Sequence, residues 1–252
     1  MSRKNTICPT KKFINERKQT MKKRIICLLI TFAVAVSVCC ALSLSVDAAG
    51  WETSGNLKFK LNYDGNSYRV AAANTSITTA NIPRSFAGKP VTEIADSGFK
   101  ECHQLRSCSI PDSIKKIGTD AFCFCEKLTD INLPSSVTYV GSSAFLCCES
   151  LTSIAIPNGT THLDSMFSGC ENLKTVYIPK TVTSFVWYTF KQCHNLETIY
   201  FAGTRAEWNE LCKNNFYTFF ETGSKTSKGT YTVICSVCPH LSKTTTPYTA
   251  PT

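Results

Sequence analysis

The sequence predicts a repeat solenoid of strand-rich α/β coils, each about 23 residues long, with a β-hairpin cap at the N-terminal end and a short helical cap at the C-terminal end. Phenylalanines recur at steps of 23, 23, 22 and 23 residues, a cysteine and a leucine follow each at fixed distances, and an Ile-Pro or Leu-Pro pair opens each unit. Periods of about 20–50 residues are typical of stacked supersecondary units. The three columns are Phe99, Phe122, Phe145, Phe167 and Phe190; Cys102, Cys125, Cys148, Cys170 and Cys193; and Leu105, Leu128, Leu151, Leu173 and Leu196.

The first 48 residues have the composition of an export leader. They carry nine Lys or Arg against two Asp or Glu, a net of +7, so only +2 of the chain's net charge of +9 remains for the other 204 residues. Residues 1–20 are interpreted as an upstream extension. Residues 21–48 are interpreted as a signal peptide, because a basic start and an apolar run lead to small residues that favour cleavage after Ala48.

The leader also bears on where the protein acts and what it contacts. We predict a secreted or cell-surface protein whose only membrane contact is the apolar run, should that run stay uncleaved. The folded part has no cluster of cations, and nucleic-acid binding needs one, so we expect no nucleic-acid partner.

The segments on either side of the repeats are predicted to cover the ends of the solenoid, as terminal units of such folds must. Residues 49–81 form the N-terminal cap, because apolar residues alternate over 57–63, a turn follows at 64–67, and the alternation resumes as the second strand of a hairpin. The solenoid is placed at 82–201. Residues 202–234 form the C-terminal cap, because 204–207 have capping-box spacing before an apolar helix face, and 230–233 add an edge strand. The tail, 235–252, holds a Cys-x-x-Cys motif and is rich in Thr and Pro.

Each coil is expected to contain two strands and one turn. The main strand ends at the Pro, which cannot donate to a strand ladder, and a second short strand follows, around 137–140 in the unit that opens at Leu133. The pattern Ala-Phe-x-x-Cys-x-x-Leu predicts a helical turn with Phe, Cys and Leu inward. Two units depart from the pattern at 160–166 and 186–189, and we expect less regular geometry there.

Eleven of the 15 cysteines follow the leader. The five of the column are expected to be buried free thiols, because side chains stacked in a column point in parallel rather than at one another. Cys235-x-x-Cys238 is half of a zinc site at most, with Cys212 and His240 as the only nearby candidates for further ligands, so we expect no metal.

Residues 57–211 resemble the BspA-type leucine-rich repeats, a branch of the leucine-rich repeat superfamily found in bacteria and protozoa. The resemblance rests on successive Ile-Pro, Ile-Gly-x-x-Ala-Phe, Cys and Leu columns, on residues 88–94 as a first repeat and on residues 201–209 as a terminal module. It implies an exported or surface protein that mediates adhesion to host components or other microbes without catalysis.

The sequence lacks the common catalytic motifs. It has no Gly-rich phosphate loop, His-Glu-x-x-His or Gly-x-Ser-x-Gly. His162, Asp164 and Ser165 are the residue types of a catalytic triad, but they crowd within four residues, whereas a triad needs convergence in space. We therefore expect a non-catalytic binding protein with no cofactor and with a protein or another cell-surface ligand as partner. The alternatives are a structural or spacer module of a larger surface assembly and an enzyme with an unrecognised site.

Outward positions of the main strands are expected to align into one binding face, because coils stack about 5 Å apart. That face turns from small and polar residues to aromatic ones toward the C-terminus, and Trp187 and Tyr188 are expected to extend it. In the alternative, the tyrosines are a cross-strand packing pair and Trp187 shields the C-terminal cap. The predicted ligand-binding residues are Asp130, Asn132, Tyr177, Tyr200, Trp187 and Tyr188.

Overall fold

The computed structural model describes residues 45–186, 188–219 and 232–235. The chain divides at residue 45 into two units, and all the repeats lie in the second. Residues 1–44 of the predicted leader, Trp187 and the Cys-x-x-Cys tail beyond Cys235 fall outside the described residues. Among the residues that are described, no helix is long and apolar enough to cross a membrane.

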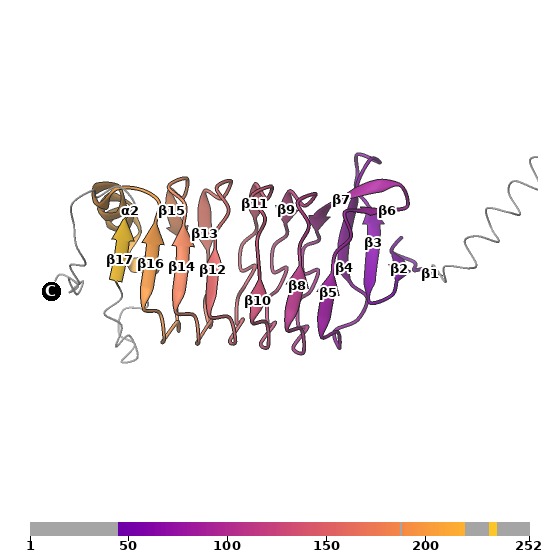
Figure 1. Cartoon of the computed structure of the whole chain (residues 1–252), viewed down its shortest axis with the longest axis horizontal. Helices are drawn as coiled ribbons and strands as arrows, with labels where there is room; N and C mark the ends of the chain where they lie inside the picture. The colour runs from indigo at the N-terminus through magenta and orange to yellow at the C-terminus, as the bar shows by residue number, and fades with distance from the viewer. Residues whose placement is uncertain (1–44, 187, 220–231, 236–252) are drawn as a thin grey trace, which may run out of the picture. The chain divides into compact units, whose positions relative to one another are not determined.

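The repeats form a β-solenoid in which strands of successive coils stand side by side between the N-terminal hairpin and α2 (Figure 1). The strands fall into two sets, named here the first and the second ladder, and every adjacent pair assigned within a coil ladder is parallel. The first ladder comprises β5 (Thr79–Asn81), β8 (Ser107–Ser109), β10 (Asp130–Ile131), β12 (Ser153–Ala155), β14 (Thr175–Ile178), β16 (Thr198–Phe201) and β17 (Thr232–Cys235). The second ladder comprises β4 (Tyr68–Ala72), β7 (Lys89–Ile94), β9 (Lys116–Ile117), β11 (Tyr139–Val140), β13 (His162–Asp164) and β15 (Ser184–Val186).

The predicted N-terminal hairpin is confirmed. β3 (Leu57–Leu61) pairs with β4 antiparallel, with Phe59 opposite Val70, and β2 (Glu52–Ser54) pairs with β3 on its other side. The remaining short strands of this region are β1 (Ser45–Val46) and β6 (Ser85–Phe86), which pairs antiparallel with β7. The Phe59 ring stacks on Phe86 with 4.1 Å between centroids, so the residues inserted into the first unit close over the hairpin.

The core is a set of columns that run the length of the repeats. The five column phenylalanines stack face to face, with successive centroids 5.2, 5.5, 6.1 and 5.6 Å apart. All five are at most 1% exposed, and the column leucines are buried as well. The prediction that Phe, Cys and Leu point inward is therefore confirmed.

The predicted helical turn is wrong, since the segment folds as consecutive tight turns. In each coil the residues two before and two after the column Phe have positive φ, which an α-helix excludes; Asp120 (55°) and Phe124 (60°) are examples. The backbone N–H of Phe122 donates to the carbonyl of Ala144 in the next coil, at 2.8 Å. Spacings of three and four residues occur equally in a helix and in these turns, and the bonds between coils select the turns.

The glycine column is explained by contact between coils. A Cβ on Gly118 would lie 2.5 Å from the backbone nitrogen of Asp96, and one on Gly141 would lie 2.5 Å from that of Thr119. No side chain fits at these positions unless the preceding coil moves.

The two units with a departing sequence keep regular strands. β13 and β15 pair in register over three residues, from His162 with Ser184 to Asp164 with Val186. No pairing is assigned between β11 and β13, so the second ladder is interrupted where the first departing unit joins it, while the two departing units are regular with each other. Thr189, which stands in the Ala column, is fully buried and donates its hydroxyl to the carbonyl of Leu163 at 2.6 Å. The hydrogen bond satisfies the extra polar group that the substitution introduces.

The C-terminal cap begins with the helix that the capping-box spacing predicts. In α2 (Arg205–Phe219), the Thr204 hydroxyl accepts from the Glu207 N–H at 3.1 Å, and the Glu207 carboxylate accepts from the Thr204 N–H at 2.7 Å. The Trp208 ring packs on Phe185 and Phe201, with centroids 5.9 and 5.3 Å apart. The expected edge strand is present as β17, which adds to the first ladder beside β16.

Candidate ligand-binding face

The outer side of the first ladder carries the aligned rows that the repeat pattern predicts. Ala155 stands opposite Tyr177, and Tyr177 opposite Tyr200, while the intervening Val176 and Ile199 are fully buried. Strand side chains alternate between faces, so this register sends the first three outward. We name the resulting series the outer row; it consists of Asn81, Ser109, Asn132, Ala155, Tyr177, Tyr200 and Ile234.

The outer row becomes aromatic at its C-terminal end. Tyr177 and Tyr200 stack with centroids 4.7 Å apart and rings tilted by only 7°. They are thus the cross-strand packing pair of the alternative interpretation. Tyr177 nevertheless stays 48% exposed, and Ile234, the next residue in the row, is 44% exposed. The same residues therefore pack together and present apolar surface to solvent.

A hollow of about 340 Å³ lies at this end of the face. It opens where β12, β14 and β16 end and where their Ile-Pro or equivalent turns begin. Its lining contains no Asp, Glu, Lys, Arg or His, and the side-chain polar groups are the Asn158 amide and the tyrosine hydroxyls. The lining residues are Ile156, Asn158, Tyr177, Ile178, Pro179, Tyr200, Phe201, Ala202 and Ile234.

The structure brings together only part of the predicted residue set. Asn132 is exposed at the same repeat position as Ala155, one coil further from the tyrosines, and Asp130 lies in β10 opposite Ser107. Tyr188 follows β15 of the second ladder, where the Nζ of Lys191 lies 5.0 Å from its ring centroid. Tyr188 therefore belongs to a different face from the tyrosine pair.

Of the residues that line the hollow, the predicted binding set included only Tyr177 and Tyr200. Ile234 lies one residue beyond the edge strand that was expected at 230–233, and its place in the hollow follows from the register of β17 with β16, which the repeat pattern does not give. Pro179 and Asn158 follow the main strands at repeat positions, so the Ile-Pro column is the signal that could have found them.

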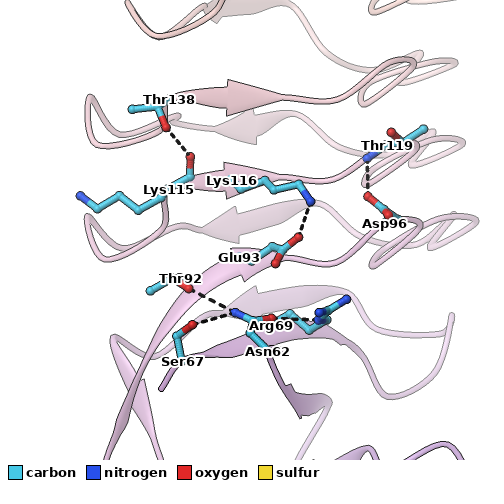
Figure 2. A network of polar contacts seen from close by, with 10 residues as sticks. All are labelled: Asn62, Ser67, Arg69, Thr92, Glu93, Asp96, Lys115, Lys116, Thr119 and Thr138. Carbon is cyan, nitrogen blue, oxygen red and sulfur yellow. Dashed lines mark hydrogen bonds and ion pairs between the residues drawn. The ribbon is translucent and has the colours of Figure 1, made fainter. Parts of the chain in front are cut away.

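The second ladder presents a charged face whose groups largely satisfy one another. The Nζ of Lys116 donates to Glu93 of the preceding coil at 2.6 Å, and Arg69 donates to the Asn62 side chain at 2.9 Å (Figure 2). The hydrogen bond with Glu93 raises the pKa of Lys116, so this cation stays charged and paired. The ring centroid of Tyr139, an exposed tyrosine, lies 5.8 Å from the Nζ of Lys116. This face offers paired charges, whereas the C-terminal end of the first ladder offers an uncharged aromatic surface.

The cysteine column offers no reactive thiolate. The five column cysteines form no disulfide, as predicted. The Sγ–H of Cys148 donates to the carbonyl of Phe122 at 3.2 Å, and Cys125, Cys170 and Cys193 bond the preceding coil in the same way. Burial raises the pKa of Cys102 to about 11 and that of Cys193 to about 12, so these thiols are protonated at neutral pH. Among the described residues, no three His, Cys, Asp or Glu side chains are grouped so as to hold a metal ion.

Comparison with known families accounts for this architecture. The profile described as "BspA type Leucine rich repeat region" matches residues 92–218 in six copies, just over half of the chain. The chain belongs to the BspA-type leucine-rich repeat family. No curated protein matches it closely enough to count as a relative.

Solved structures of bacterial leucine-rich repeat proteins are similar to this BspA-type chain. A leucine-rich repeat protein of T. pallidum shares 28% identity over 57% of this chain and 68% of its own, with a TM-score of 0.54. A leucine-rich cell surface protein of Faecalibacterium prausnitzii shares 28% identity over 62% of this chain and 56% of its own, with a TM-score of 0.43. The pneumococcal vaccine antigen PcpA shares 18% identity over 70% of this chain and 47% of its own, with a TM-score of 0.41.

Proposed function

We propose that this BspA-type protein is an exported, non-catalytic adhesion protein that binds a protein on a host cell, in the host matrix or on another microbe. The observation that carries the proposal is the exposed Tyr177–Tyr200 stack beside an uncharged hollow. Tyrosine is enriched at protein interfaces, because it adds a large contact area and a hydroxyl group at low cost in side-chain entropy. The first-ladder face is therefore the binding face, with Tyr177 and Tyr200, near its C-terminal end, as the main contact residues.

Further support comes from the contrast between the two ladders. A partner gains least where surface charges already bond one another, as Lys116 and Glu93 do on the second ladder. Apolar surface on the first ladder is exposed to water in the free protein, and covering it is favourable. The aromatic end of the first ladder is thus the better place for contact energy to concentrate.

The binding test uses the double variant Tyr177→Ala with Tyr200→Ala. Purified protein is titrated against immobilised host matrix proteins and whole microbial cells. We expect the variant to lose at least tenfold in affinity for any partner that the wild type binds, because hot-spot aromatic residues commonly contribute 2 kcal/mol or more, roughly a thirtyfold change. Its melting curve should stay nearly unchanged, since Tyr177 is half exposed.

Tyr139→Ala is the matched control. Tyr139 is 49% exposed, as Tyr177 is 48%, but it lies on the second ladder. This variant should bind normally. Normal binding by the double variant, or equal losses in the double variant and the control, would refute the assignment of the face.

Export is tested separately on native cells. The mature chain should begin at or near Ala49 and be found outside the cytoplasm, because the leader has the basic, apolar and small-residue segments of a signal peptide. Cytoplasmic protein with residues 21–48 intact would contradict export.

A further inference from the structure

The tyrosine stack has one covered end and one open end. Tyr177 lies between β12 and β16 in the first ladder, and its ring face toward β16 is covered by Tyr200. On the far side of Tyr200, Ile234 of β17 occupies the next position of the outer row. The second ring face of Tyr177 is turned toward β12, where the residue in register is Ala155.

The small side chain of Ala155 leaves a slot beside that ring face. Neighbouring strands lie about 4.8 Å apart, and the two tyrosine rings keep nearly the same separation, 4.7 Å. Ala155 is exposed and extends only a methyl group, so the ring position above it is open to solvent. The slot is thus one strand wide: Tyr177 forms its wall, Ala155 its floor, and Asn132 follows at the next position of the outer row.

We propose that this slot receives an uncharged aromatic side chain of a protein partner, which extends the tyrosine stack to three rings. The inference rests on the proposed function and adds the chemistry of the group that is recognised. The core of the same protein shows that coil spacing suits stacked rings, because five phenylalanines stack there at 5.2 to 6.1 Å. A third ring over Ala155 would repeat on the surface what the core already does.

The absence of charged groups among the residues that form the slot favours an uncharged occupant. The slot residues Tyr177, Ala155 and Asn132 carry no charge, and the hollow that Tyr177 also lines has no ionisable group other than the tyrosine hydroxyls. A buried cation or anion of the partner would therefore find no counter-charge there. A neutral sugar could also stack on Tyr177, but its hydroxyl groups need several donors and acceptors. The hollow supplies only the Asn158 amide and the tyrosine hydroxyls among its side chains, while Ile156, Ile178 and Pro179 are apolar. An aromatic side chain fits this balance better than a sugar does.

The test fills the slot and leaves both tyrosines in place. In Ala155→Tyr, the introduced ring should occupy the slot, and Ala155→Leu should block it with a smaller group. Ser109→Tyr is the matched control, because it adds the same ring to an exposed position of the outer row two coils away. The probes are N-acetyltryptophanamide, N-acetylleucinamide and methyl β-glucopyranoside, and binding is followed by NMR of the Tyr177 ring protons in the full mature chain.

We expect N-acetyltryptophanamide to shift the Tyr177 signals saturably at millimolar concentration, at least tenfold more tightly than N-acetylleucinamide. Both Ala155 variants should weaken this binding more than tenfold, and Ser109→Tyr should not. Equal binding of the tryptophan and leucine probes, preference for the glucoside, or undiminished binding by both Ala155 variants would each overturn the inference. A Tyr248→Ala chain that binds the probe tenfold tighter would also overturn it, because the chain's own tail would then be the occupant.

The same variants separate this inference from the proposed function. If the Tyr177→Ala, Tyr200→Ala double variant loses its protein partner while both Ala155 variants keep it, the binding face stands and the slot does not. If none of these variants affects partner binding, both assignments fail.

Discussion

Replacing Phe145 by alanine should remove the middle ring of the core stack and destabilise the solenoid strongly. Phe145 is fully buried, with Phe122 and Phe167 on either side at centroid distances of 5.5 and 6.1 Å. Truncation of a buried Phe to Ala typically costs about 3–5 kcal/mol, and the cost is highest where the surroundings cannot collapse into the cavity.

The hydrogen bonds between coils place Phe145 at the upper end of that range. Its N–H donates to the carbonyl of Met166, and the N–H of Phe122 donates to that of Ala144, so bonded backbone holds the neighbouring rings apart. We expect a loss of about 4–5 kcal/mol in the free energy of unfolding. At roughly 2–4 °C per kcal/mol for a domain of this size, Tm should fall by about 8–20 °C.

The assay is denaturant and thermal unfolding followed by circular dichroism. Phe124→Ala is the matched control, since Phe124 lies in the same column of turns but is 36% exposed, and its truncation should cost about 1 kcal/mol or less. Lys115→Ala should change little, because the Lys115 side chain is exposed and extends away from the coils (Figure 2). Equal losses in Phe145→Ala and either control would refute the assignment of inward and outward positions.

Three further predictions concern other columns and the cap. Gly141→Ala should cost about 1–3 kcal/mol in a denaturant titration, because its Cβ would lie 2.5 Å from the Thr119 nitrogen; a neutral effect would mean that the coils are not closely stacked. Burial raises the pKa of Cys193 from 9.0 to about 12, so the folded protein keeps this thiol protonated at pH values where the unfolded chain loses the proton. This contribution to the free energy of unfolding is fully present below pH 9.0 and is lost as pH rises toward about 12. The stability difference between wild type and Cys193→Ala should therefore shift by roughly 1.4 kcal/mol per pH unit above pH 9, against the wild type, and a constant difference would exclude a buried thiol. Deleting residues 202–220 should produce aggregates in size-exclusion chromatography, because Phe185 and Phe201 lose the cover of Trp208; a soluble, monomeric truncation would argue against a capping role.

The repeat length and the choice of inward-pointing residues could be predicted from the sequence, because each repeat places the same residue type against the same neighbours. Columns of Phe, Cys and Leu mark buried positions whatever the local backbone does, and alternation around Val176 and Tyr177 identifies the outward side of a strand. The hairpin of β3 and β4 and the start of α2 were likewise readable, since turn residues and the Thr204–Glu207 capping box act over a few neighbouring residues.

Tertiary structure decided the features that depend on contacts between coils. Spacing alone could not separate a helical turn from the tight turns around Phe122, because hydrogen bonds to the next coil make that choice. The hollow beside Tyr200 needs Ile234, which joins only when β17 pairs with β16. Tyr188 was predicted to extend the tyrosine surface, but it follows β15 and therefore lies on the second ladder. A sequence with a strong repeat thus determines which side chains are buried and which strands stack, whereas long-range pairing at the end of the solenoid determines which exposed residues meet in one site.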